Sequence, residues 1–123
     1  EIYLLFQHEY SANFLFTLWK RVRKYGAYAT GITQNVDDLL QSHTARTMLA
    51  NSEFIIMLNQ APTDRIELAK LLNISDNQLS YITNVGAGHG LIKVGSSLIP
   101  FANKFPKNTK LYKLMTTKPG EGV

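Results

Sequence analysis

Cysteine is absent from the 123-residue sequence, which excludes disulfide bonds and thiolate metal sites. This absence suits a reducing compartment without requiring one. No apolar run approaches the roughly 20 residues that a membrane-spanning helix needs. The first residues, EIYLLF, lack the basic start and the cleavage site of a signal peptide. A disulfide scaffold and a helical membrane protein are therefore not expected.

The residues that are present describe a globular chain. Hydrophobic residues make up 45% of the sequence and charged residues 18%, a balance unlike that of disordered chains. The length allows one domain that buries roughly two-thirds of its unfolded surface. The net charge of +4 allows contact with nucleic acid or an anionic membrane surface, although such a balance commonly reflects a solvated surface. We interpret residues 1–123 as a single truncated domain, because Glu1 opens directly on an apolar run with no capping turn.

Predicted strands and helices alternate along the chain. Continuous apolar runs predict buried strands, and apolar residues spaced by three and four predict helices. This alternation favours an α/β fold with a mostly parallel sheet, covered on both faces and extended by an antiparallel hairpin. The predicted helices cover residues 9–25, 36–41, 44–51, 62–72 and 75–84. The predicted strands cover residues 2–6, 28–33, 53–58, 91–94, 98–102 and 111–116.

Two polar residues stand beside predicted buried strands. Glu1 precedes the first strand, where a carboxylate could polarise the water that attacks a nucleoside triphosphate. By itself, however, Glu1 is more simply an exposed charge at a chain end. Gln34 follows the second strand, and its amide can donate and accept, so it could hold a water against a terminal phosphate. An ordinary turn residue before the Asn35 helix cap explains Gln34 equally well.

A basic cluster closes the first predicted helix. It precedes Gly26, a residue typical of helix C-termini, and its charges are favourable for the helix dipole. The arginine guanidinium is a rigid fork suited to phosphate, so the cluster could act on the nucleotide of a neighbouring subunit. Considered alone, a charged helix end is more commonly a solvated face. The cluster consists of Lys20, Arg21, Arg23 and Lys24.

The helix pair within residues 64–84 has the spacing of a helix-turn-helix. Asn77, Gln78 and Tyr81 on its second helix could contact bases. This second helix carries no arginine or lysine, and predicted strands flank the pair, so a helical hairpin packed on the sheet is favoured. A non-enzymatic DNA-binding module remains the alternative function. A third reading is an interaction domain whose unpaired sheet edge docks on a partner.

Two other patterns carry no predicted chemistry. The glycine-rich segment 86–90 is not followed by Gly-Lys-Ser/Thr, and it precedes a strand instead of joining a strand to a helix. We expect a helix-to-strand turn there. The three histidines, His8, His43 and His89, lie far apart and have no carboxylate at ligand spacing. No metal site and no Ser-His-Asp triad is predicted.

Four segments resemble the conjugative-transfer ATPases of type IV secretion systems, particularly the VirB-type ATPases on mobile elements of Gram-positive bacteria. These segments read LWKRVRKYG, ATGITQNVDDLL, SEFIIMLNQ and GLIKVGSSLIPFANKFPKNTKLYKLMTTKPGE. The family belongs to the HerA/FtsK branch of RecA-like P-loop NTPases. The resemblance implies the C-terminal portion of a RecA-like three-layer sandwich, beginning at the Walker B strand. The nucleotide-binding Gly-Lys-Ser/Thr loop is not in this sequence, so we expect these residues alone not to hydrolyse ATP.

The resemblance also implies roles for individual residues. Glu1 matches the Walker B glutamate that activates water, and Gln34 matches a strand-end sensor of the γ-phosphate. Arg23, with Lys20 or Lys24 nearby, matches a basic helix end that reaches a neighbouring subunit's nucleotide. The implied cofactors of the whole protein are ATP and Mg²⁺.

The implied partners are further copies of the chain, with a hexamer expected, the type IV secretion channel components, and DNA as a candidate. The implied location is the cytoplasm, peripheral to the inner face of the bacterial plasma membrane. We also expect the segment to self-associate or to be marginally stable, because missing sheet neighbours would leave apolar surface exposed.

Overall fold

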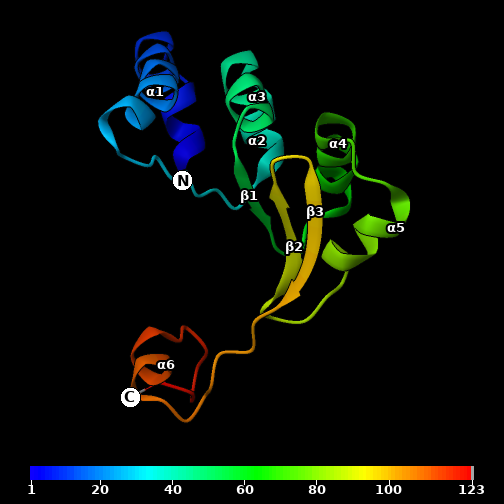
Figure 1. Cartoon of the computed structure of the whole chain (residues 1–123). Coiled ribbons are helices and arrows are strands. Elements are labelled where there is room, and N and C mark those ends of the chain that lie inside the picture. The colour runs from blue at the N-terminus through cyan, green and yellow to red at the C-terminus, as the bar shows by residue number, and fades with distance from the viewer. Residues whose placement is uncertain (123) are drawn as a thin grey trace.

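A computed structural model describes residues 1–122 (Figure 1). Three strands form one sheet, and helices pack against one of its faces. No helix in this range is long and apolar enough to cross a membrane. The strands are β1 (Phe54–Met57), β2 (His89–Val94) and β3 (Ser97–Ala102). The α-helices are α1 (Glu9–Arg21), α2 (Val36–Leu40), α3 (His43–Ala50), α4 (Pro62–Leu72), α5 (Asp76–Leu79) and α6 (Lys110–Met115). Three 3₁₀ helices are η1 (Ile2–Phe6), η2 (Val22–Tyr25) and η3 (Ser80–Ile82).

The sheet is antiparallel, with the strand order β1-β2-β3. Ile92 at the centre of β2 pairs with Ile56 on one side and Ile99 on the other. Gly95, at φ 57°, makes the tight turn between β2 and β3, a backbone region that favours glycine. The predicted hairpin is therefore confirmed. The mostly parallel sheet is not found among the described residues.

One face of the sheet carries the core. Ile55, Met57 and Leu91 point into it and meet the helices α2 and α4 and the 3₁₀ helix η3. Leu68 and Ile82, from α4 and η3, are fully buried there. These contacts account for the confirmed helical hairpin on the sheet. Burial of such side chains contributes roughly 1.5–3 kcal/mol each.

The opposite face of the sheet is bare. Alternate residues along β1 point outward, and Phe54 and Ile56 are 62% and 65% exposed. Ile99 on β3 is 49% exposed. Because these residues share one face through the strand pairing, the bare face is a continuous apolar surface. The predicted helical cover on both faces is thus missing from one face in the described residues.

Three predicted strands have a different structure. Residues 2–6 form η1, residues 28–33 contain no strand, and residues 111–115 lie in α6. An apolar run becomes a strand only when another strand supplies hydrogen-bond partners along its length, and the first two runs share just the bond from the Ile2 N–H to the Ile32 carbonyl. In α6 the spacing of Leu111, Leu114 and Met115 is helical, and the hydroxyl of Thr109 accepts a hydrogen bond from the Tyr112 N–H.

Two pairs of residues in α4 and α5 have the spacing of a capping box, and one of them forms it. Ser75 and Gln78 form a capping box at the start of α5, as their spacing indicates. Asp64 and Glu67 have the same spacing but form no capping box, because the N-cap residue of α4 is Ala61, three residues before Asp64. Asp64 is instead 6% exposed and faces α2.

Residues 104–122, termed the C-terminal unit, extend away from the sheet after β3 (Figure 1). The rings of Phe105 and Tyr112 stack with centroids 6.5 Å apart. The Glu121 carboxylate accepts hydrogen bonds from the Tyr112 hydroxyl and from Lys107 Nζ, the latter at 3.0 Å. These contacts hold the unit together around α6.

Candidate functional site

The candidate site lies where the start of the chain meets residues 31–34. The backbone N–H of Ile2 donates a hydrogen bond to the Ile32 carbonyl at 3.1 Å. Glu1 is one residue from this contact and Gln34 is two residues from it, so the fold brings the two predicted catalytic residues to one region. Both residues are exposed. The two segments meet although neither forms a strand.

The residues on both sides of Gln34 are fixed by hydrogen bonds at the start of α2. Thr33 Oγ1 donates to the Asn35 carbonyl at 3.2 Å, which stabilises a turn across Gln34. Asn35 stands at the N-cap position, but its side chain makes no capping bond. The N–H of Val36 donates instead to Asp64 Oδ2 from α4, at 3.4 Å. Sequence reasoning missed this role for Asp64, since the partner lies 28 residues away.

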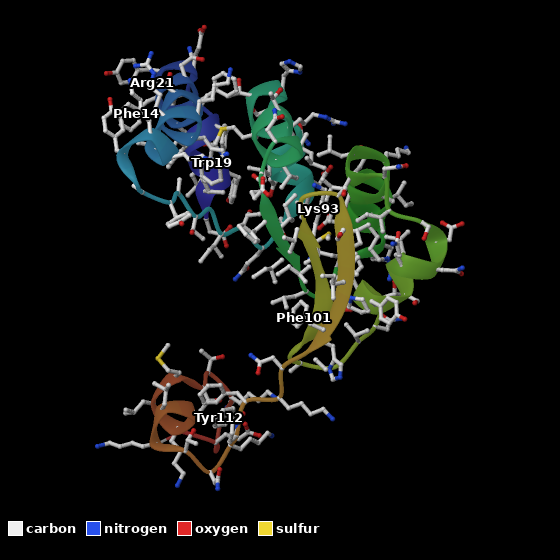
Figure 2. All side chains as sticks on the ribbon, in the orientation of Figure 1. Phe14, Trp19, Arg21, Lys93, Phe101 and Tyr112 are labelled. Atoms are coloured by element: carbon white, nitrogen blue, oxygen red, sulfur yellow. The ribbon has the colours of Figure 1, made fainter. Side chains whose placement is uncertain are left out.

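Trp19 connects α1 to this region. Its indole Nε1 donates to Ser52 Oγ at 3.3 Å, at the end of α3. Its ring also lies close to Gly31, where a Cβ would stand 3.4 Å from the ring and 2.7 Å from Ile2 Cδ1. Gly31 thus permits close packing of Trp19, Ile2 and the segment before Gln34. Figure 2 shows Trp19 on the inner side of α1, below the exposed Arg21 and Phe14.

The basic cluster lies at the end of α1 and in η2, and all four of its side chains are exposed. Lys20 Nζ stands 4.3 Å from the centroid of the Phe16 ring, a cation–π contact within the helix. Gly26 takes φ 67° and ends η2, as predicted. Among residues 1–122 no hydrogen bond or ion pair joins Arg23, Lys20 or Lys24 to Glu1 or Gln34. Because the cluster makes no such bond to Glu1 or Gln34 of its own chain, its action on a neighbouring subunit is compatible with the structure.

An open groove of about 370 Å³ lies beside the candidate site. It runs between η1 and α2, and it mixes aromatic with acidic and amide side chains. Sequence analysis gave no signal for it, because its two walls form only when η1 packs against α2. The lining residues are Tyr3, Phe6, Gln7, Asp38, Gln41 and Ser42.

The residues present fit only part of an ATP–Mg²⁺ site. Within residues 1–122 no cluster of three or more His, Asp or Glu side chains could hold a metal ion. The glycine-rich segment forms the predicted turn into β2. Gly88 takes φ 81° there, a Cβ on it would overlap the Asn103 carbonyl oxygen, and the Asn103 N–H donates to the Gly88 carbonyl at 2.7 Å. Glu1 and Gln34 could contact the γ-phosphate end of a nucleotide. The described residues supply no phosphate-binding loop for the rest of the nucleotide.

The helix pair α4–α5 does not match a DNA-reading pair. The second helix, α5, has only four residues before it tightens into η3. The Gln78 amide oxygen accepts from the Ser75 N–H at 3.0 Å, which occupies one of the side chains predicted to read bases. Asn77 and Tyr81 are exposed. A recognition helix needs several turns along the major groove, which α5 does not provide.

Comparison with known proteins defines the class of protein. The sequence model of the TraG P-loop domain family matches residues 1–93. The chain therefore belongs to the TraG P-loop domain family, and the resemblance to conjugative-transfer ATPases is confirmed.

A solved structure gives a more particular similarity. The chain resembles the structure of VirB4 of Thermoanaerobacter pseudethanolicus, with a TM-score of 0.72 and 27% sequence identity over 78% of this chain. The match covers 26% of the VirB4 chain, so the present chain spans about a quarter of its solved relative. The comparison with curated proteins gives no match.

Proposed function

We propose that these residues form the C-terminal part of an ATP-hydrolysing motor domain that energises conjugative transfer through a type IV secretion system. The observation that carries the proposal is the backbone contact between Ile2 and Ile32, which lies within the family segment. This contact gathers Glu1 and Gln34 in one exposed region. A carboxylate beside an amide suits the positioning of a hydrolytic water, which is most of what phosphoryl transfer requires of the protein.

In this proposal Glu1 orients and deprotonates the attacking water. The Gln34 amide contacts the γ-phosphate and reports whether it is present. Arg23, assisted by Lys20 or Lys24, neutralises charge on the nucleotide of a neighbouring subunit in a homo-oligomer, which we expect to be a hexamer. Bound Mg²⁺ would neutralise charge on the β- and γ-phosphates. The phosphate loop and the metal-linked aspartate would come from parts of the ATPase outside these 123 residues.

The proposed motor acts in the cytoplasm, peripheral to the inner face of the plasma membrane, and passes its work to the secretion channel. Support for this setting comes from the family to which the chain belongs and from its similarity to VirB4.

The test is Gln34→Ala in the full-length ATPase that contains this segment. We expect ATP turnover to fall by about 10²-fold or more, because an interaction made in the transition state is lost, while nucleotide affinity stays within a fewfold. Asn77→Ala is the matched control, since it removes an exposed amide from α5. Unchanged turnover in Gln34→Ala would overturn the sensor assignment.

A further inference from the structure

The net charge of the protein is concentrated in the C-terminal unit. Residues 104–122 contain five lysines and one glutamate, which equals the entire net charge of +4. The rest of the chain carries eight basic and eight acidic side chains and is neutral. The five lysines are Lys104, Lys107, Lys110, Lys113 and Lys118.

Most of these lysines are available to a partner. Lys107 is occupied, because its Nζ lies 3.0 Å from Glu121 and 6.0 Å from the Tyr112 ring centroid. The other four are exposed and form no ion pair with any residue from 1 to 122. Four uncompensated cations within nineteen residues produce a strong local positive potential.

Exposed apolar side chains stand among these lysines. Leu111, Leu114 and Met115 share one face of α6, and they are 56%, 60% and 73% exposed. Phe105 is 48% exposed beside them. An open apolar hollow of about 360 Å³ lies between Phe105 and this helix face. Apolar surface of this kind is costly to leave in water.

The fold leaves this surface free. The C-terminal unit projects beyond the end of β3, and Figure 2 shows Tyr112 well away from the sheet residues Lys93 and Phe101. The unit also lies outside the segment matched by the family model, which ends at residue 93. Its surface is therefore separate from the packing of the sheet and from the candidate site.

We propose that the C-terminal unit is a contact site for an anionic lipid membrane. The apolar face of α6 enters the boundary between headgroups and acyl chains, and the flanking lysines bind headgroup phosphates. Lipid is favoured over nucleic acid for two reasons. Every cation in the unit is a lysine, whereas arginine predominates in direct contacts to bases. The exposed leucines and methionine have no counterpart on a phosphate backbone, but they match a lipid interface. The site does not depend on ATP hydrolysis.

The test is sedimentation of the 123-residue chain with lipid vesicles. One set consists of phosphatidylcholine, and the other of phosphatidylcholine and phosphatidylglycerol in a two-to-one mixture. We expect binding to the anionic set only, and we expect it to weaken as salt is added because the attraction is screened. Binding to both sets alike would overturn the proposal, since the bare sheet face could cause it without any role for charge.

Matched variants locate the contact. Lys113→Glu and Lys70→Glu make the same charge change in the last turn of α6 and of α4. Since each lysine near an anionic surface strengthens binding roughly fivefold, Lys113→Glu should weaken it at least about tenfold, and Lys70→Glu much less. Leu114→Ser should also weaken binding, whereas Ile66→Ser, at an equally exposed position on α4, should not. If the two charge reversals weakened binding equally, or if the two serine substitutions did, the assignment of the contact to the C-terminal unit would be contradicted.

Nucleic acid is the competing partner in the same experiment. Binding of duplex DNA that is lost in Lys113→Glu, together with no binding to anionic vesicles, would assign the unit to nucleic acid and overturn the lipid proposal. Circular dichroism of each variant confirms that the chain is folded. Failure of the Gln34→Ala experiment would leave these outcomes unaffected, because they measure binding alone.

Discussion

Asp64 on α4 accepts a hydrogen bond from the backbone N–H of Val36, the first residue of α2, at 3.4 Å. Asp64 is 6% exposed and is the one buried charged side chain among residues 1–122. It occupies the place that a local N-cap would take, since Asn35 makes no side-chain cap. The contact therefore fixes the start of α2, two residues after Gln34, against a helix that belongs to the core.

Removal of this contact should destabilise the fold. In Asp64→Ala the Val36 N–H loses its acceptor in a buried position, and we expect a loss of about 1–3 kcal/mol in the free energy of unfolding. Asp64→Asn keeps an acceptor oxygen and should lose less. Urea unfolding followed by circular dichroism measures the difference. Asp76→Ala, an exposed acid at the start of α5, is the control and should cost about 0.5 kcal/mol. Equal losses at both positions would show that burial of Asp64 is not the cause.

Gly90 on β2 should tolerate no side chain. A Cβ there would overlap the Met57 carbonyl oxygen and lie 2.9 Å from the Phe101 ring. We expect Gly90→Ala to lose about 1–3 kcal/mol of stability, because the backbone oxygen cannot move aside without breaking the pairing of β1 with β2. Gly86→Ala is the matched control, since its nearest neighbour would be 3.7 Å away. A fully stable Gly90→Ala protein in thermal unfolding would contradict the strand packing.

The C-terminal unit should respond to pH at both ends of the scale. The Glu121 carboxylate accepts hydrogen bonds from the Tyr112 hydroxyl, which has the larger effect, and from Lys107. Both hydrogen bonds lower the pKa of this carboxyl below its usual 4.5. Its contribution to stability is therefore present above pH 4.5 and is lost as pH falls through the lowered pKa. The hydrogen bond to Glu121 and the attraction of its charge raise the pKa of Lys107 above 10.5. The contribution of Lys107 is present below pH 10.5 and is lost as pH rises through the raised pKa.

Amide chemical shifts of residues 104–122, followed by NMR from well below pH 4.5 to above pH 10.5, test this linkage. We expect the shifts to hold through neutral pH and to change together in strong acid and in strong base. In Glu121→Gln the acid transition should disappear, because the titrating carboxyl is gone, and the basic transition should move to lower pH, because Glu121 no longer raises the pKa of Lys107. An unchanged acid transition in that variant would assign it to another group.

The bare face of the sheet should cause self-association. Ile56 and Ile99 are exposed and pair across the strands with the half-buried Ile92 between them, so two chains can bury this apolar row against each other. We expect Ile56→Lys to shift the chain toward a monomer in sedimentation velocity. Ile66→Lys, a similarly exposed isoleucine on α4, should leave the association unchanged. A wild-type chain that stays monomeric at all concentrations would contradict this use of the face.

The sequence predicted those elements whose hydrogen bonds are local. Helices α1 to α4 are found close to their expected positions, and the Ser75–Gln78 capping box is formed. The β2–β3 hairpin also follows from a short turn at Gly95. The strand predicted at 111–116 is wrong, because Leu111, Leu114 and Met115 are spaced by three and four residues, as on a helix, and do not alternate as on a strand. Glu1 and Gln34 were selected from the sequence, and the fold places them in one region, while their roles stay predictions.

The sequence by itself thus determined where the chain turns helical, where it reverses, and that the chain belongs to the TraG P-loop domain family. Only the tertiary structure decided which apolar runs became strands, that Asp64 caps α2, and that the charged C-terminal unit stands apart from the neutral remainder. The physical reason is the range of the interactions. A helix satisfies its backbone within four residues, whereas a strand, a distant cap or an exposed face depends on which other segments lie beside it.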